Sequence, residues 1–219
     1  KLIKINQIKI DSILEIFSKT LEYENFNEIN QYITEELINT FIKNIIINNE
    51  KIINDKYFSD IKINFDKKKI INYFRENKIP YVEYYPKEFL LIIYEKDELN
   101  DNLFSKNNRY YSYFINNLQS NKLFKIPNLD INDRFILKIN DVKNKDIEKI
   151  KNFSKKYNSN EIIIIQTEKN KDNFIYNLTL LSDGEILEKK LKLNKIELDN
   201  FYITLEKEAL NVWKKINQI

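Results

Sequence analysis

Residues 89–94 read FLLIIY and residues 161–165 read EIIII, and these two apolar runs decide the expected fold. Continuous apolar runs of this length are typical of central strands that are buried on both faces. Segments with strand and helix periodicity alternate around them. The sequence therefore predicts an α+β protein with mixed sheets packed against helices.

The second half of the chain contains most of the expected sheet. Ser182-Asp183-Gly184-Glu185 is predicted to be a hairpin turn, because Asp-Gly tolerates the positive φ that tight turns need. The other elements expected here are helices over 109–118, 141–157 and 198–217, and strands over 123–126, 174–180 and 186–193.

The first half is expected to form a smaller lobe. Its predicted elements are a strand over 2–10, a helix over 26–47, a strand over 57–65 and a helix that Asp66 caps at its N-terminus. Pro86 restricts the residue before it and marks the boundary. We therefore expect a strand–helix–strand–helix lobe over 1–86 and a strand–helix–strand–helix–three-strand–helix lobe over 87–219.

Composition indicates a folded protein with a nearly balanced charge. The chain has 219 residues, is 42% hydrophobic and has a net charge of +3 from 36 basic and 33 acidic residues. Arginine occurs only at Arg75, Arg109 and Arg134, whereas nucleic-acid-binding domains usually present a dense basic face. Nucleic acid is thus an unlikely partner, and the excess of Lys, Ile and Asn indicates an AT-rich genome.

The residue types that are missing exclude many kinds of chemistry. With no His and no Cys, the chain cannot use histidine acid–base catalysis, thiol nucleophiles or His and Cys metal sites. With Gly184 as its single glycine, it cannot form a P-loop or a GxGxxG turn. We expect no cofactor and no bound transition metal, and more likely no enzymatic activity.

The chain contains no uninterrupted apolar stretch of about 18 residues, so no membrane span is predicted. It begins at Lys1, contains no Met and lacks the pattern of a signal peptide. We expect a processed, exported chain from which a signal peptide has been removed.

The tract Pro127–Arg134 holds the first candidate site. Asp130, Asp133 and Arg134 are two carboxylates three residues apart beside a guanidinium. We interpret them first as a structural turn in which the Asp side chains accept backbone N–H bonds and Arg134 pairs with a carboxylate. A ligand or partner contact and acid–base catalysis are the second and third interpretations.

Aromatic residues form the second candidate site. Tyr110 and Tyr111 belong to a group that also includes Tyr81, Tyr84, Tyr85, Tyr113 and Phe114. Such a group can stack on bases or sugars, but packing in a core or an interface is the first interpretation.

Four tracts carry a resemblance to a known family: INFDKKKIINYFRENKIP (63–80), FLLIIYEKD (89–97), KIPNLDINDRF (125–135) and FSKKYNSNEIIIIQTE (153–168). In this order they resemble the bacterial domain of unknown function 2066 family of envelope-associated proteins. On that pattern Asp130, Asp133, Ser154 and Tyr157 fall on signature positions. The element order of the second half is also similar to the N-terminal domain of the Tol translocation protein.

The resemblance implies an exported protein of the Gram-negative envelope with no known reaction. We therefore expect a non-enzymatic periplasmic protein that binds another envelope protein; a cytoplasmic nucleic-acid-binding or processing domain is the alternative. The sequence sets no oligomeric state.

Overall fold

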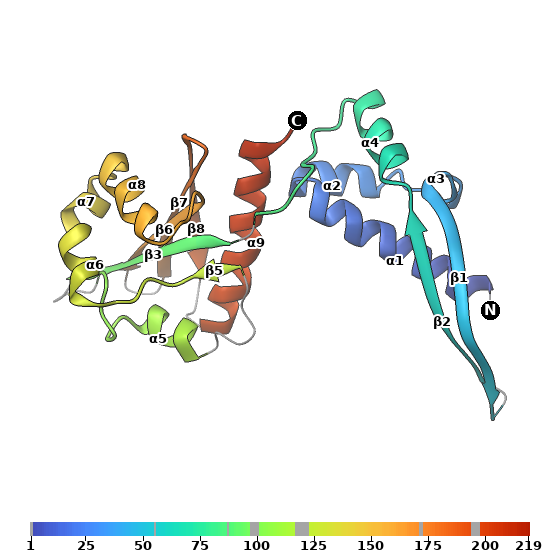
Figure 1. The fold of residues 1–219 in the computed structure, drawn as a ribbon, viewed down its shortest axis with the longest axis horizontal. Coiled ribbons are helices and arrows are strands. Elements are labelled where there is room, and N and C mark those ends of the chain that lie inside the picture. The colour runs from blue at the N-terminus through green and yellow to red at the C-terminus, as the bar shows by residue number, and fades with distance from the viewer. Residues whose placement is uncertain are drawn as a thin grey trace. The chain divides into compact units, whose positions relative to one another are not determined.

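The fold is α+β, as the sequence predicts (Figure 1). The computed structural model describes residues 2–54, 56–86, 88–96, 101–116, 123–170, 173–193 and 198–219. It divides into two compact units: Lys1–Tyr85 with Asn217–Ile219, and Pro86–Ile216. Each unit has a hydrophobic core of its own.

The second unit is built on a mixed sheet with the strand order β4-β3-β6-β7-β8, in which β5 also pairs with β3. The strands are β3 (Phe89–Lys96), β4 (Asp101–Asn102), β5 (Phe124–Lys125), β6 (Ile162–Asn170), β7 (Asn173–Ser182) and β8 (Glu185–Leu193). The two apolar runs lie side by side as the parallel strands β3 and β6. The Asp183-Gly184 turn joins the antiparallel strands β7 and β8, with a φ of 95° at Gly184.

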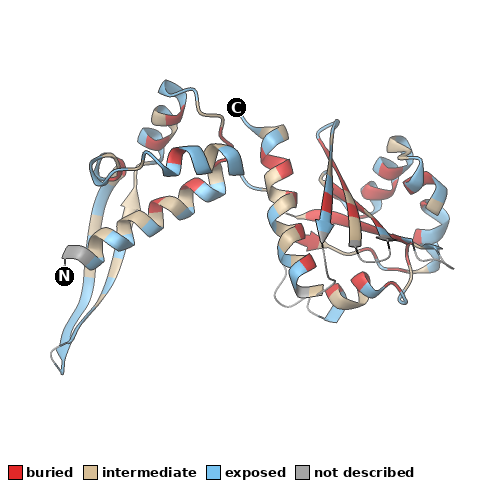
Figure 2. Cartoon of the chain, turned by 180° about the vertical axis from the view of Figure 1, so that it is seen from behind, coloured by how far each residue is buried: buried red, intermediate tan, exposed pale blue. Residues whose placement is uncertain are grey.

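Helices cover both faces of this sheet. On one face, α5 (Arg109–Asn116) and α9 (Leu198–Asn217) meet over Tyr176 of β7, because Phe201 packs against the rings of both Tyr110 and Tyr176. On the other face lie α7 (Ile139–Lys143) and α8 (Ile147–Lys156); the side chain of Gln166 on β6 donates to the carbonyl oxygen of Val142 on α7. Figure 2 shows the buried residues concentrated on the strands between these layers.

Two predictions for this unit need correction. The helix expected over 141–157 is two helices, because Lys145 adopts a φ of 53° and Asp146 then caps α8 by accepting from the Lys149 N–H. The tract expected as a turn contains a short helix, α6 (Ile131–Ile136). The helix predicted over 109–118 is confirmed as far as Asn116, and residues 117–118 lie outside the described residues.

The described residues of the first unit form four helices and a hairpin. The helices are α1 (Leu2–Thr20), α2 (Tyr23–Asn30), α3 (Glu35–Phe41) and α4 (Lys67–Glu76), and the hairpin is formed by β1 (Ile42–Ile53) and β2 (Lys56–Phe65). Phe17 of α1 lies at the centre of the core, in edge contact with Phe41 and Phe74. Asp66 caps α4, as predicted, by accepting from the N–H groups of Lys68 and Lys69.

Three predictions for the first unit are wrong. The opening strand over 2–10 is the start of α1; its helical spacing becomes clear only with Ile13, Phe17 and Leu21, all of which are buried. The helix over 26–47 is α2, α3 and the first half of β1, since Thr34 caps a new helix and the β-branched run Ile45-Ile46-Ile47 pairs with β2. The described sheet of this unit is an antiparallel pair, not a mixed sheet.

Candidate functional site

Asp130 fixes the start of α6. Its carboxylate accepts from the backbone N–H of Asp133 at 2.9 Å, which satisfies one of the free N–H groups at the beginning of a helix. The backbone just before it is unusual, because Leu129 has a φ of 59°. The capping role predicted for Asp130 is therefore confirmed.

Asp133 anchors the other side of α6 and is fully buried. Its carboxylate accepts from the Leu129 N–H at 3.0 Å, from the Lys156 Nζ at 2.6 Å and from the Tyr157 hydroxyl at 2.7 Å. The same Tyr157 hydroxyl accepts from the Asn128 N–H at 2.9 Å. A buried carboxylate with this many donors is a structural anchor, because the donors replace the water that the charge has lost.

The groups around Asp133 titrate far from neutrality. Burial, followed by the hydrogen bond to Asp133, raises the pKa of Tyr157 to about 12. The hydrogen bond to Asp133 is also the main reason why the pKa of Lys156 is raised. Neither Tyr157 nor Lys156 is therefore suited to exchange a proton near pH 7.

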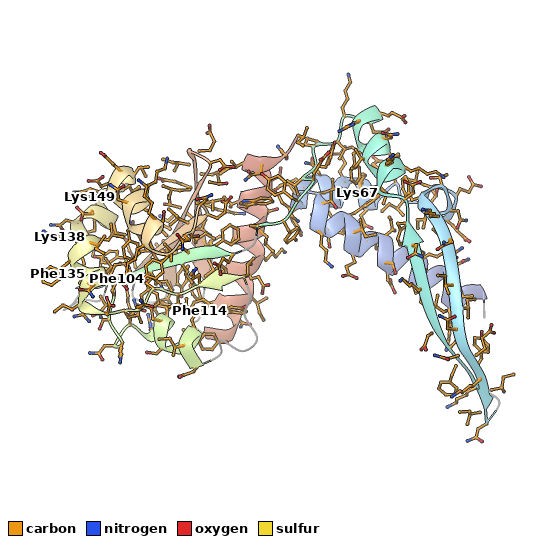
Figure 3. The ribbon with its side chains drawn as sticks, viewed as in Figure 1. Lys67, Phe104, Phe114, Phe135, Lys138 and Lys149 are labelled. Carbon is orange, nitrogen blue, oxygen red and sulfur yellow. The ribbon has the colours of Figure 1, made fainter. Side chains whose placement is uncertain are left out.

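The outward side of α6 is apolar. Ile131, Phe135 and Ile136 are 66%, 71% and 44% exposed. We call these three side chains the α6 crest. Figure 3 shows Phe135 at the same end of the second unit as Lys138 and Phe104. A cluster of large exposed apolar groups on one short helix is typical of an interaction surface.

A pocket of about 360 Å³ lies beside the crest, and we call it the α6 pocket. Its apolar lining comes from Leu103, Phe104, Leu137 and Ile139. Asp101 to Ser105 follow the carboxyl end of β3, the edge at which open α/β sheets bind ligands. Arg134 lies at this pocket because its Nε donates to the Phe104 carbonyl oxygen at 2.7 Å.

Arg134 therefore differs from its prediction. Among the described residues it forms no ion pair, and a backbone carbonyl takes the place of the carboxylate that was expected. One of its five N–H donors is used in this contact, so the guanidinium keeps donors for another group.

The α6 pocket carries two positive charges. Arg134 and Lys138 both line it, and neither forms an ion pair in the described part of the chain. Asp141, which accepts from Lys149 at 2.5 Å, also interacts with the charge of Lys138. Asp101 also lines the pocket, but it accepts from Lys143 at 2.5 Å and from the Tyr94 hydroxyl at 2.7 Å. These two hydrogen bonds, that of Lys143 first, lower the pKa of Asp101, whose charge is thus already balanced.

Tyr110 and Tyr111 are both fully buried, so the structure gives them the packing role. The Tyr111 hydroxyl accepts from the Ile93 N–H at 2.7 Å and so ties α5 to β3. The Tyr110 hydroxyl lies 3.4 Å from that of Tyr176 and accepts from Arg109 at 3.1 Å. Neither ring is available for stacking on a ligand at the surface.

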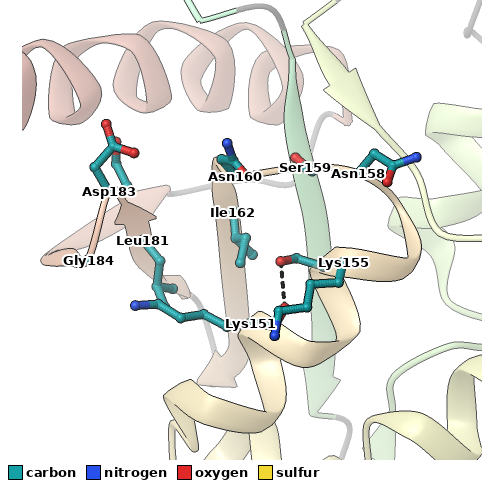
Figure 4. A pocket seen from close by; sticks show the side chains of 11 residues that line it. Lys151, Lys155, Asn158, Ser159, Asn160, Ile162, Leu181, Asp183 and Gly184 are labelled. Atoms are coloured by element: carbon teal, nitrogen blue, oxygen red, sulfur yellow. Dashed lines mark hydrogen bonds between the residues drawn. The ribbon is translucent and has the colours of Figure 1, made fainter.

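Ser154, the remaining signature position, lines a second pocket of about 360 Å³ between α8 and the β7–β8 turn (Figure 4). Its hydroxyl donates to the carbonyl oxygen of Lys151 at 2.9 Å. The neighbouring amines are also engaged, Lys155 with Asn152 and Lys156 with Asp133. The described contacts of Lys155 and Lys156 therefore do not support serine–lysine chemistry through either amine.

Two general properties of the described residues bear on the site. No three of their Asp and Glu side chains gather closely enough to hold a metal ion. No helix among them combines the length and apolarity needed to cross a bilayer.

Sequence reasoning found Asp130, Asp133 and Arg134 but missed Phe135 and Lys138. Ile131, Phe135 and Ile136 look like the core face of a helix in the sequence, and only the anchor at Asp133 shows that this face points to solvent. Lys138 comes two residues after α6 and reaches the pocket because the chain turns into α7 there.

Comparison with known proteins places the chain in no family. No model of a known protein family matches it, and no curated protein is detectably similar in sequence. Among solved structures, it is similar to the LpoB C-terminal domain from Salmonella enterica, with 12% sequence identity and a TM-score of 0.33. The alignment covers 52% of this chain and 87% of that domain. Likeness at this level indicates neither a shared family nor a shared function.

Proposed function

We propose that the protein is a non-enzymatic periplasmic binding protein whose α6 crest docks on another protein of the cell envelope. The observation that carries this proposal is the exposure of Ile131, Phe135 and Ile136 on a helix that the buried Asp133 carboxylate holds in place. Exposed apolar groups on a rigid base lose little entropy when a partner covers them, which favours binding.

The location in the envelope is supported by the sequence tracts that resemble the domain of unknown function 2066 family. Two of those tracts supply the Asp133–Tyr157 contact, at 2.7 Å, on which α6 rests. Asp133 and Tyr157, which both fall on signature positions, thus share a structural task in this chain.

The alternative, nucleic-acid binding, has less support because several of the lysines around the sheet already have acidic partners. Lys125 pairs with Glu88, Lys143 with Asp101, Lys145 with Glu188, Lys149 with Asp141 and Lys189 with Glu208. Lysines neutralised in this way release few counterions from a phosphate backbone.

The test compares three forms of the full chain as baits in solubilised envelope extract of the native host. The baits are wild type, Phe135→Ser and the control Ile52→Ser, which changes a side chain that is 76% exposed in the hairpin. We expect one envelope protein to be retained by wild type and control and lost from Phe135→Ser, and the purified pair to bind with the same pattern. Equal retention by all three baits, or location of the native protein in the cytoplasm by cell fractionation, contradicts the proposal.

A further inference from the structure

The α6 pocket has two properties that apolar docking of the crest alone does not use. Part of its lining is apolar, and of these residues Phe104 and Leu137 are almost completely buried beneath it. It is also cationic, since Arg134 and Lys138 form no ion pair among the described residues while Asp101 is paired with Lys143. An occupant must therefore supply both an apolar group and negative charge.

The two cations are placed to act together with the crest. Arg134 lies between the buried anchor Asp133 and the exposed Phe135, and its Nε is fixed on the Phe104 carbonyl oxygen at 2.7 Å. Its guanidinium is thus positioned before binding, and its remaining N–H groups match the two oxygens of a carboxylate. Lys138 adds a second positive charge at the same pocket.

We propose that the partner contributes an acidic–apolar peptide segment, whose apolar side chain enters the α6 pocket while an adjacent carboxylate pairs with Arg134 and Lys138. This inference rests on the proposed function and names the chemistry of the segment that α6 binds. The apolar part fits the Leu103, Leu137 and Ile139 lining, and the charge of the segment distinguishes it from basic or neutral segments.

The probe is a displayed library of random short peptides, panned on the full wild-type chain. We expect the selected peptides to carry Asp or Glu beside Leu, Ile or Phe. The tightest of them is then synthesised together with a matched peptide in which every Asp and Glu is replaced by its amide. The amide version should bind at least about tenfold more weakly, as expected for the loss of a charge-assisted contact.

Single substitutions locate the contact. Lys138→Gln and Arg134→Gln should each weaken the binding of the acidic peptide on the order of tenfold. Lys190→Gln removes the same charge from an exposed lysine of β8, the strand at the opposite edge of the sheet from β4, and should leave the affinity unchanged. Lys138→Gln is the decisive variant if Arg134→Gln lowers the melting temperature.

Selection of basic or uncharged peptides, selection of none, or unchanged binding by Lys138→Gln overturns this inference. The proposed function survives such a result if the envelope partner still distinguishes wild type from Phe135→Ser. If that distinction is also lost, both proposals fail.

Discussion

Asp133 is the single residue on which the position of α6 depends most. Its buried carboxylate receives donors from Leu129, Lys156 and Tyr157. Removing the carboxylate is destabilising, because the buried Leu129 N–H and Tyr157 hydroxyl lose an acceptor that they cannot replace. If Asp133 were only a capping residue, as the sequence suggests, its removal would lower the free energy of unfolding by only about 1 kcal/mol.

We therefore expect Asp133→Asn to lower the free energy of unfolding by about 3 kcal/mol, measured by denaturant titration. Glu148→Gln is the matched control, since it neutralises an exposed carboxylate on α8 and should change stability by less than about 0.5 kcal/mol. Equal stabilities of the two variants would show that the Asp133 network contributes little.

Glu161 makes the stability of the fold depend on pH in the opposite direction to most carboxylates. Burial raises its pKa, although the nearby polar groups of Ser182 and Trp213 lower it in part. The folded state then holds a proton more tightly than the unfolded chain, so the stability from this group is fully present below its ordinary pKa of 4.5 and is lost as pH rises through the folded value.

Glu161→Gln should accordingly be more stable than wild type at pH 7, and this advantage should disappear below about pH 4. The fluorescence of Trp213, the single Trp of the chain, reports unfolding in both proteins. An advantage that grows on acidification would contradict the raised pKa.

At the scale of elements, α6 carries a buried residue that stabilises the fold and exposed residues that we propose for binding. Phe135 is 71% exposed, so Phe135→Ser should leave the melting temperature nearly unchanged. Phe153 of the neighbouring α8 is fully buried and stacks on Phe104 at 4.9 Å. Phe153→Ala should cost roughly 3–5 kcal/mol. If Phe135→Ser destabilises the protein to a similar degree, the crest is part of the core.

The elements that sequence reasoning placed well are those with local signals. Two buried strands, the Asp183-Gly184 hairpin and the Asp66 cap each depend on a few adjacent residues. Residues 2–10 fit the alternating pattern of a strand over nine residues. They form a helix because the following residues Ile13 and Phe17 pack in one core with α3 and α4. Similarly, Ile45-Ile46-Ile47 fits the end of a helix until β2 supplies a partner strand.

The same difference between local signals and long-range contacts explains which parts of the site could be predicted. Asp130 caps α6 through a contact between residues three positions apart, and this role was predicted from the sequence. The meeting of Asp133 with Tyr157 joins residues 24 positions apart, and the pocket joins Asp101 to Lys138; neither follows from local sequence.

At the scale of the whole molecule, the two units have separate cores and should respond separately to a core mutation. Phe74→Ala removes a fully buried ring that contacts Phe17 and Tyr81 in the first unit. Hydrogen exchange should become faster within residues 1–85 and remain unchanged over the strands β3 and β6. Faster exchange in β3 and β6 would show that the units fold as one.

Photo-cross-linking in living cells tests most directly whether α6 contacts a partner. A photoreactive phenylalanine analogue is placed at Phe135 or, as a control, at Tyr32, which is 66% exposed in the first unit. We expect position 135 to give an adduct with one envelope protein, reduced by Lys138→Gln if the acidic segment is correct, and position 32 to give none. An absence of adducts at position 135, or the same adducts at both positions, would contradict a binding role for α6.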